Sequence, residues 1–315
     1  MTEIGGYFGL ESLIHNEYYP NLIAVNNARN ALLYILKAKK IKKIYIPYFL
    51  CDSVSSMCDR EGYGYEYYNI GPDFMPIFDR ELENDQYIYI VNYYGQIDNV
   101  TINCLKEKYR NIIVDNVQAF FAEPVEGVDT VYSCRKFFGV PDGGYVSTNA
   151  MLDEKIDIDI SKDRMAHILG RYEGNASDYY SDFKNNDGSF DKLELRYMSK
   201  LTHNILGAID YEYVKRKREE NFAFLAEMLG DKNPLGAKSN VGPYAYPFYI
   251  KNGIKVKRAL AEKKIYVPTL WPNVLDMDGT LEKDYAENIL PLPVDQRYSR
   301  EDMERIVYEV RKCIN

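Results

Sequence analysis

Short β-rich runs alternate with helical stretches between about residue 21 and residue 150, and this alternation constrains the fold more than any other feature. The clearest runs are KIYIP (43–47), YIYIVNYY (87–94), NIIVD (111–115), DTVYS (129–133) and GGYVST (143–148). The segment after Arg29 has apolar residues at helical spacing, and Asn26 or Asn27 is a suitable N-cap. The pattern predicts βαβ units and therefore an α/β fold with a mainly parallel central sheet flanked by helices.

The second half of the chain has a different pattern. Residues 150–200 include the acidic run DEKIDIDISKD and the turn-rich run SDFKNNDGSFDK, which predict an irregular connection rather than a metal loop. A long helix is expected from about residue 210, with its KRKREE run facing solvent. Strands at 246–251 and 265–268, a helix near 255–264 and a last helix with a Ser299–Asp302 capping box follow.

These patterns predict two domains. We expect a large domain over residues 1–205, in which residues 1–20 could pack on the other domain, and a smaller C-terminal α/β domain over residues 206–315.

Composition excludes several classes of function. The formal net charge of −8 argues against a broad nucleic-acid or membrane-surface role. No leader-like segment and no apolar stretch of membrane-spanning length is found, so a soluble cytoplasmic protein is expected. The five cysteines lack CxxC spacing and the three histidines lack an HExxH pattern, so we expect neither a disulfide framework nor a metal site.

Three polar residues at the carboxyl ends of predicted strands are candidates for chemistry. Asp115 ends NIIVD, Ser133 ends DTVYS and Lys136 follows that run, at the edge where open parallel sheets bind ligands. A buried aspartate there either caps a turn or holds a cation such as the protonated ring nitrogen of pyridoxal phosphate. Phe137 and Arg135 beside the lysine would favour a neutral amine, unless this is a surface Arg-Lys pair.

The start of the predicted helix at AVNNARNALLYIL offers an anion site. Free backbone N–H groups and the helix dipole favour a phosphate there, although most capped helices bind nothing. Neither a GxxxxGK[ST] loop nor a GxGxxG fingerprint is present to support an alternative phosphate or dinucleotide site.

In these segments the chain resembles the DegT/DnrJ/EryC1/StrS family of pyridoxal-phosphate-dependent sugar aminotransferases, of fold type I. The resemblance is carried, in family order, by NNARNAL, YIPYFLCDSV, VNYYGQ, IIVDNVQAFF and YSCRKFFGVPDGGYVST. It implies a homodimer with active sites at the subunit interface. The chain departs from the family pattern in its Asn27-Ala28 pair, in the short spacing from Ser133 to Lys136 and at Pro141.

The resemblance also implies roles for individual residues. Lys136 would form the Schiff base with the cofactor and shuttle protons, Asp115 would pair with the pyridine nitrogen, and Gln118 would lie against the ring. The other implied cofactor contacts are Asn27, Ala28 and Ser133 at the phosphate and Tyr48 or Phe49 on the ring face. The implied substrate contacts are Tyr7, Phe8, Arg196 and Arg297, for which packing or surface roles are the alternatives.

The implied reaction is transfer of an amino group from glutamate or glutamine to a keto group of a nucleotide-linked sugar, in polysaccharide or secondary-metabolite sugar synthesis. One alternative is a dehydratase-like enzyme with the same fold and cofactor. Another is a non-catalytic homodimer with a regulatory or assembly role.

Overall fold

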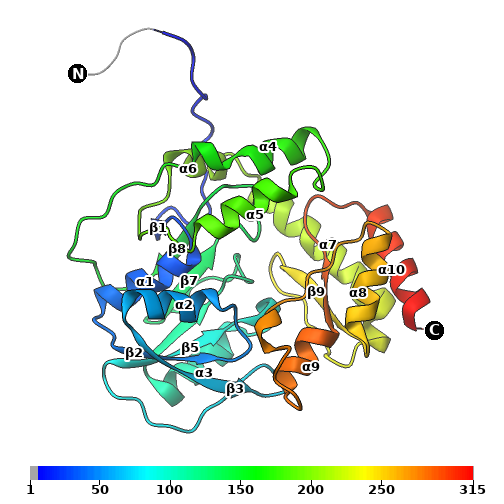
Figure 1. Cartoon of the computed structure of the whole chain (residues 1–315), viewed down its shortest axis with the longest axis horizontal. Coiled ribbons are helices and arrows are strands. Elements are labelled where there is room, and N and C mark those ends of the chain that lie inside the picture. Colours follow the sequence, from blue (N-terminus) through cyan, green and yellow to red (C-terminus); the bar gives the residue numbers. More distant parts are fainter. Residues whose placement is uncertain (1–5, 315) are drawn as a thin grey trace.

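The central feature of the computed structural model, which describes residues 6–314, is an eight-stranded sheet (Figure 1). Its spatial order is β1-β8-β7-β6-β5-β2-β3-β4. The strands are β1 (Ile23–Val25), β2 (Lys43–Pro47), β3 (Gly64–Ile70), β4 (Pro76–Ile77), β5 (Gln86–Val91), β6 (Ile112–Asp115), β7 (Asp129–Ser133) and β8 (Gly144–Ser147). The five strands from β3 to β7 in this order pair in parallel, and the remaining pairs are antiparallel. The predicted α/β fold with a mainly parallel sheet is confirmed.

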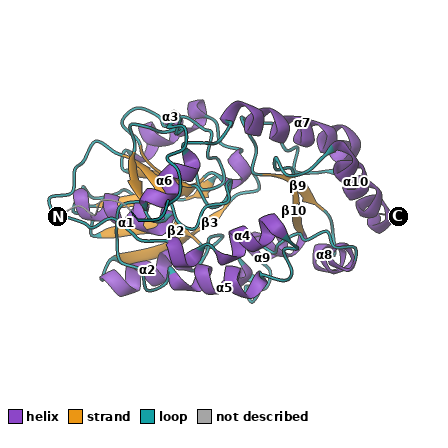
Figure 2. Cartoon of the chain, turned by 90° about the horizontal axis from the view of Figure 1, so that it is seen from above, coloured by secondary structure: helices purple, strands orange, loops and turns teal. Residues whose placement is uncertain are grey.

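Helices cover both faces of this sheet. Those of the first two thirds of the chain are α1 (Ala28–Ala38), α2 (Ser53–Glu61), α3 (Asn99–Tyr109), α4 (Ala166–Glu173), α5 (Tyr180–Ser189) and α6 (Lys200–Leu206). Figure 2 shows α3 on one side of the sheet and α2 on the other. The two helices lie on opposite faces because both crossovers are right-handed but run in opposite directions along the sheet. The crossover through α2 leads from β2 to β3, and the crossover through α3 leads from β5 to β6.

The last third of the chain forms a second layer of structure around a small sheet. It contains α7 (Tyr211–Leu229), β9 (Ala245–Tyr249), α8 (Gly253–Glu262), α9 (Leu281–Asn288), β10 (Ile289–Pro293) and α10 (Arg300–Ile314). The buried apolar residues of α7, α8, α10 and the β9–β10 pair make a core of their own, but Trp271 and Tyr285 pack into the core of the large sheet. We therefore keep the two-domain division as a proposal.

Two predictions for this region were wrong. Residues 265–268 form no strand, and the partner of β9 is β10, whose sequence ILPLP contains two prolines. Proline cannot donate to a ladder and is tolerated here because the pair has only two strands, both of them edges. The KRKREE run of α7 does not face solvent throughout, because Arg218 is only 1% exposed.

The connection between residues 150 and 200 is more regular than predicted. It contains α4 and α5, which lie across the upper side of the molecule in Figure 1, next to α6. The sequence of α5, YSDFKNNDGS, has weak helix formers, so packing rather than propensity stabilises it. Asp159, in the DIDI run, is buried and paired with Arg164 rather than solvated.

None of the helices that the structure describes combines the length and the apolar character that crossing a bilayer requires.

Candidate active site

The strand register brings the predicted site residues to one edge of the sheet. Asp115 is the last residue of β6 and pairs with Val131 of β7. Ser133 ends β7 and pairs with Gly144, which in turn pairs with Val25 at the end of β1. The start of α1, the end of β6 and the loop after β7 therefore meet at the carboxyl edge of the parallel strands.

The contact between β8 and the start of α1 depends on a glycine. A Cβ on Gly144 would lie 2.8 Å from the carbonyl carbon of Asn27 and 2.9 Å from the amide nitrogen of Ala28. Any side chain there would push α1 away from the sheet. Gly144 thus lets the first turn of α1 approach the end of β7, where Ser133 is buried.

Asn27 caps α1 as predicted. Its Oδ1 accepts the N–H of Asn30 at 2.8 Å, and its backbone is extended. Its Nδ2 is buried without a hydrogen-bond partner among the described residues. A buried donor beside free helix N–H groups fits an anionic ligand group, such as a phosphate, at this terminus.

Asp115 is a buried carboxylate, 6% exposed, that lacks an ion-pair partner within 4 Å among the described residues. Its Oδ2 accepts the hydroxyl of Tyr89 at 2.8 Å and its Oδ1 accepts the N–H of Val117 at 2.8 Å. Burial raises the pKa of Asp115 to about 6, although these two hydrogen bonds and the charge of Lys136 act in the opposite direction. Such a group is ready to pair with a cation that a ligand brings.

Lys136 lies in the loop after β7, and its side chain is exposed. The predicted desolvation by neighbouring aromatics was wrong. Phe137 and Phe138 point away into a buried aromatic cluster with Phe120 and Tyr211, so they do not cover the amine. The two neighbours instead anchor the loop and leave Lys136 free to reach a ligand at the edge.

Gln118 holds a strained turn. Its Oε1 accepts the N–H of Tyr94 at 2.8 Å, in the short helical turn that follows β5. Tyr94 has a φ of +55°, which is unfavourable for a residue with a side chain. Gln118 therefore stabilises the turn that follows β5 at this edge of the sheet.

The two aromatic candidates after β2 differ. Phe49 is fully buried, with its ring centroid 4.4 Å from that of Trp271, and its carbonyl accepts the hydroxyl of Tyr93 at 2.6 Å. A ring-stacking role for Phe49 is therefore not supported. Tyr48 is partly exposed and stacks on Tyr67 with ring centroids 4.6 Å apart.

The candidate substrate residues do not converge within one chain. Tyr7 and Phe8 are 98% and 96% exposed, on an N-terminal segment that leaves the body of the molecule in Figure 1. They therefore do not line the entrance of the candidate site within this chain. The carbonyl of Arg196 accepts the N–H of Asn26 at 2.9 Å, which places its backbone next to the start of α1. Arg297 makes a two-pronged ion pair with Asp295, which raises the pKa of the arginine.

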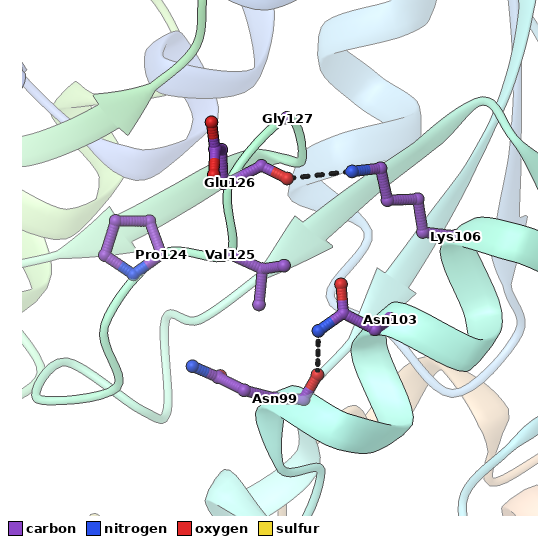
Figure 3. A pocket seen from close by; sticks show the side chains of 7 residues that line it. All are labelled: Asn99, Asn103, Lys106, Pro124, Val125, Glu126 and Gly127. Atoms are coloured by element: carbon purple, nitrogen blue, oxygen red, sulfur yellow. Dashed lines mark hydrogen bonds between the residues drawn. The ribbon is translucent and has the colours of Figure 1, made fainter.

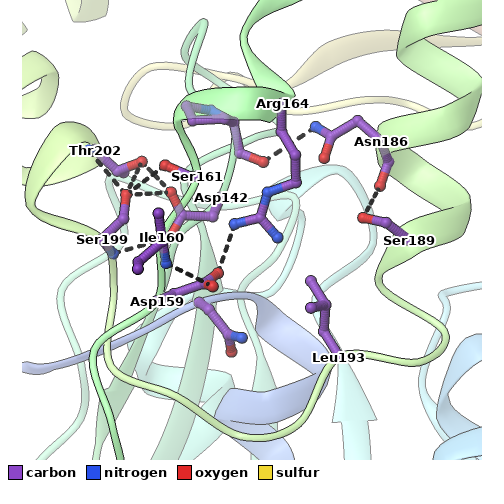
Figure 4. Close-up of polar contacts among 12 residues, drawn as sticks. Asp142, Asp159, Ile160, Ser161, Arg164, Asn186, Ser189, Leu193, Ser199 and Thr202 are labelled. Atoms are coloured by element: carbon purple, nitrogen blue, oxygen red, sulfur yellow. Dashed lines mark hydrogen bonds and ion pairs between the residues drawn. The ribbon is translucent and has the colours of Figure 1, made fainter.

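Two features of the site were missed by the sequence patterns. The hydroxyl of Tyr89 donates to Asp115, but in the sequence Tyr89 cannot be distinguished from the other β-forming residues of a buried strand. Asp142 is fully buried, and accepts the N–H and hydroxyl of Ser199 at 2.9 and 2.8 Å and the hydroxyl of Thr202 (Figure 4). It ties the loop that follows Lys136 to the start of α6, a contact between residues too distant in sequence for a local pattern to reveal.

The lysine loop is also tied to the last third of the chain. The carbonyl of Phe137 accepts Nε2 of Gln296 at 2.9 Å and a guanidinium N–H of Arg218 at 3.3 Å. The Arg218 guanidinium lies 4.6 Å from the centroid of the Phe137 ring, and burial lowers the pKa of the arginine to about 10. Residues of α7 and of the β10–α10 connection thus fix the residue next to Lys136.

A surface hollow in the described part of the chain lies away from this edge. It has a volume of about 620 Å³ and is lined by α3 and by residues 124–127, where Lys106 donates to the carbonyl of Glu126 (Figure 3). None of the candidate site residues lines it, so it carries no argument for the chemistry of the edge.

Comparison with known proteins decides the fold. No family model and no curated protein matches the sequence. Among solved structures, the sugar aminotransferase CalS13 from Micromonospora echinospora aligns with 93% of this chain and 87% of its own, at 13% identity and a TM-score of 0.61. A DegT DnrJ EryC1 StrS aminotransferase from Brucella abortus aligns with 92% of this chain and 85% of its own, at 17% identity and a TM-score of 0.62. The chain has the fold of the DegT/DnrJ/EryC1/StrS aminotransferases.

A third structure with this aminotransferase fold concerns the cofactor. The PLP form of Spr1654 from Streptococcus pneumoniae, assigned as a sugar aminotransferase, aligns with 92% of this chain and 86% of its own, at 13% identity and a TM-score of 0.64. Identities this low establish the fold alone, so activity has to be argued from the residues of this chain.

Those residues fit pyridoxal phosphate within the aminotransferase fold. The first turn of α1 and the unpartnered Nδ2 of Asn27 suit a phosphate, buried Asp115 suits a protonated ring nitrogen, and exposed Lys136 offers an amine. The three lie on one edge because β1, β6 and β7 all end there.

Proposed function

We propose that the protein is a pyridoxal-phosphate-dependent aminotransferase in which Lys136 and Asp115 are the catalytic residues. The observation that carries the proposal is that an amine, a buried carboxylate and the start of a helix meet at one sheet edge in an aminotransferase fold. The alternatives for each residue alone, a surface lysine, a turn-capping aspartate and a simple capped helix, do not account for their meeting.

The cofactor, when bound, supplies an electron sink that permits a proton to leave the carbon bearing the amine. Lys136 takes up and returns that proton at Nζ, which its exposed position permits. Asp115 keeps a ring nitrogen protonated, and its own charge is then stabilised by the cation it holds. Tyr89 and the N–H of Val117 orient the carboxylate.

We assign the remaining cofactor contacts to residues at the same edge. Asn27, Ala28 and Ser133 bind the phosphate, since Gly144 brings the start of α1 against the end of β7. Gln118 would lie beside the ring and Tyr48 would offer an aromatic face. We retain Arg196 and Arg297 as substrate residues, with the amino group coming from glutamate or glutamine.

We propose a nucleotide-linked keto sugar as the acceptor, and a homodimer as the working form. Support for a sugar comes from the neighbours in fold, several of which are named sugar aminotransferases. The isolated chain leaves Tyr7 and Phe8 without contacts, which supports a partner subunit.

Cofactor binding is tested by absorbance. Purified protein incubated with pyridoxal phosphate should develop a visible band that borohydride bleaches, and Lys136→Ala should lack it. Lys42→Ala is the matched control, because Lys42 is exposed and lies at the amino end of β2, away from the edge. A wild-type protein that stays colourless, or a Lys136→Ala variant that keeps the band, contradicts the proposal.

The acceptor is tested separately. Protein preloaded with glutamate loses the visible band, and a keto sugar nucleotide that is a substrate restores it. If the band forms but glutamate never removes it, a dehydratase-like reaction with the same cofactor is favoured. If no cofactor binds, the non-catalytic homodimer is favoured.

A further inference from the structure

Two arginines beside the candidate site converge on the end of α5. Arg29, in the first turn of α1, donates to the carbonyl of Phe190 at 3.0 Å and pairs with Asp191 at 2.8 Å. Arg135 lies 4.1 Å from the centroid of the Phe190 ring and pairs with Asp187 at 3.2 Å. The last turn of α5 and the two residues after it thus cover cations from two different elements.

The pairs are unequal in burial. The side chains of Arg29 and Arg135 are 15% and 18% exposed, whereas those of Asp191 and Asp187 are 67% and 55% exposed. The arginine side chains are thus largely buried, whereas the carboxylates lie on the outer side and are largely solvated. A half-exposed ion pair contributes little free energy, so a better anion could replace these carboxylates.

A third ion-paired arginine lies beside the same ring. Arg164 lies 5.4 Å from the same Phe190 ring, and it pairs with Asp159 at 2.6 Å (Figure 4). Burial lowers the pKa of Arg135, and the charge of Arg164 lowers it further. Clustered, partly desolvated guanidinium groups favour an anion with more than one charge.

Unpartnered donors point to the same place. Six buried side-chain polar atoms lack a hydrogen-bond partner among the described residues, and three of them are donors: Asn27 Nδ2, Arg29 Nε and Arg164 Nε. Asn27 Nδ2 is the donor assigned above to the cofactor phosphate, whereas Arg29 Nε and Arg164 Nε belong to arginines that contact Phe190. Buried donors without acceptors are costly, and phosphate oxygens are the acceptors that they suit best.

The position of the arginines relates them to the candidate site. Arg29 directly follows Ala28, and Arg135 directly precedes Lys136. A ligand group held by both would lie alongside the cofactor at the same sheet edge.

We propose that Arg29 and Arg135 bind the diphosphate group of a ligand, and that Asp187 and Asp191 occupy this site until the diphosphate displaces them. Asp187 lies in the last turn of α5 and Asp191 two residues beyond its end, and each carboxylate neutralises one arginine. A diphosphate supplies two linked anionic groups to replace them, and the planar guanidinium fork matches phosphate oxygens. The claim that the diphosphate belongs to a nucleotide-linked sugar rests on the proposed function, whereas the claim of an anion site does not.

Binding to the full chain is tested by titration calorimetry with inorganic pyrophosphate and with uridine diphosphate. We expect Arg29→Gln and Arg135→Gln each to weaken binding by about tenfold or more. We expect the Asp187→Asn/Asp191→Asn double variant to bind severalfold more tightly, because the internal competitors are lost. Arg80→Gln, which removes an ion-paired arginine beside the opposite end of the sheet, is the control and should bind as wild type.

The variants also provide the outcomes that overturn the proposal. Unchanged affinity in Arg135→Gln, or weaker binding in the double aspartate variant, rules out the competition. Arg135→Lys keeps the positive charge but lacks the planar guanidinium group. Its affinity for pyrophosphate should fall between those of wild type and Arg135→Gln. A thermal melt shows whether each variant is folded.

A second comparison separates the two possible sources of phosphate. If Arg135→Gln weakens loading of pyridoxal phosphate but not of pyridoxal, and leaves pyrophosphate binding unchanged, the arginines serve the cofactor and the diphosphate proposal is wrong. If wild type never develops the visible band but still binds pyrophosphate, the proposed function fails while the anion site stands.

Discussion

At the scale of single residues, Asp115 shows how burial prepares a group for a ligand. The carboxylate is nearly sealed, and its two hydrogen bonds do not offset the loss of hydration, so its pKa rises to about 6. An ion kept in so unfavourable a place costs stability unless a cation accompanies it. Perturbed acids in such places are typical of functional sites.

Asp115→Asn should therefore stabilise the protein without cofactor while abolishing activity. Because the folded-state pKa lies above the unfolded value, the contribution of Asp115 to wild-type stability is greatest below about pH 4 and falls as pH rises through about 6. The variant should gain on the order of 2 kcal/mol at pH 7.5 and little at pH 4. Denaturant unfolding at both pH values measures this, and an equal effect at both would contradict the assignment.

The sequence placed the site residues better than their surroundings. Asp115, Ser133 and Lys136 could be located because each ends or follows a strongly patterned strand, and that position fixes the sheet edge. The aromatic neighbours of Lys136 were misjudged, because a local sequence cannot say to which side a loop residue turns. Tyr89 could not be singled out, since its contact with Asp115 crosses from β5 to β6.

At the scale of elements, the loop that carries Lys136 is rigid because distant elements hold it. Buried Arg218 of α7 donates to the carbonyls of Phe137 and Pro243, and Gln296 shares the Phe137 carbonyl. This contact links the small sheet layer to the candidate lysine. Hydrophobic spacing predicted α7 correctly, but a charge run gives no sign that one arginine turns inward.

Arg218→Gln should destabilise the protein by about 2–4 kcal/mol, because buried carbonyls lose a charged donor. It should also weaken cofactor loading, since the lysine loop loses an anchor. Arg216→Gln is the matched control, because Arg216 lies on the same helix with its side chain 64% exposed, and it should change stability by less than about 0.5 kcal/mol. Thermal melts and titration of the visible band measure the two effects, and equal behaviour of both variants would contradict the anchor.

The elements predicted well are those whose pattern is local. KIYIP and DTVYS match β2 and β7 residue for residue, and the capping box of Ser299 and Asp302 opens α10. α5 and β10 were missed because their residues have poor propensity, and only tertiary packing or pairing with β9 makes them regular.

At the scale of the whole molecule, several polar contacts hold the N-terminal segment to the body, among them the N–H of Leu13 to Asn204 and the contacts of Glu17. Glu17 accepts the hydroxyl of Tyr145 at 2.7 Å and contacts Nδ1 of His203 at 2.6 Å. The hydrogen bond to Glu17 raises the pKa of His203. The sequence showed isolated histidines only, because the partners lie in distant parts of the chain.

This pairing predicts a pH-dependent attachment. A histidine whose folded-state pKa is raised adds stability below its unfolded value of about 6.5, and that stability is lost as pH rises through the folded value. His203→Gln should thus lower the melting temperature more at pH 6 than at pH 8.5, by an amount equivalent to about 0.5–1 kcal/mol. A difference that is independent of pH would show that the pair is a simple hydrogen bond.

The exposed apolar side chains that precede Glu17 in the N-terminal segment bear on assembly. Tyr7 and Phe8 are almost fully exposed, and Leu10 and Ile14 are 68% and 78% exposed, which is unfavourable for an isolated chain in water. If the working form is the homodimer that we propose, these side chains should be buried against the partner. The double variant Tyr7→Ser/Phe8→Ser should then dissociate at a protein concentration at least tenfold higher than wild type, by sedimentation velocity, because two buried aromatics contribute about 1.5–3 kcal/mol each. Tyr172→Ser removes an equally exposed tyrosine from α4 and leaves the segment intact, so it serves as the control. A dimer of unchanged affinity in the double variant would place the interface elsewhere, and a wild-type monomer would require each chain to complete its site alone.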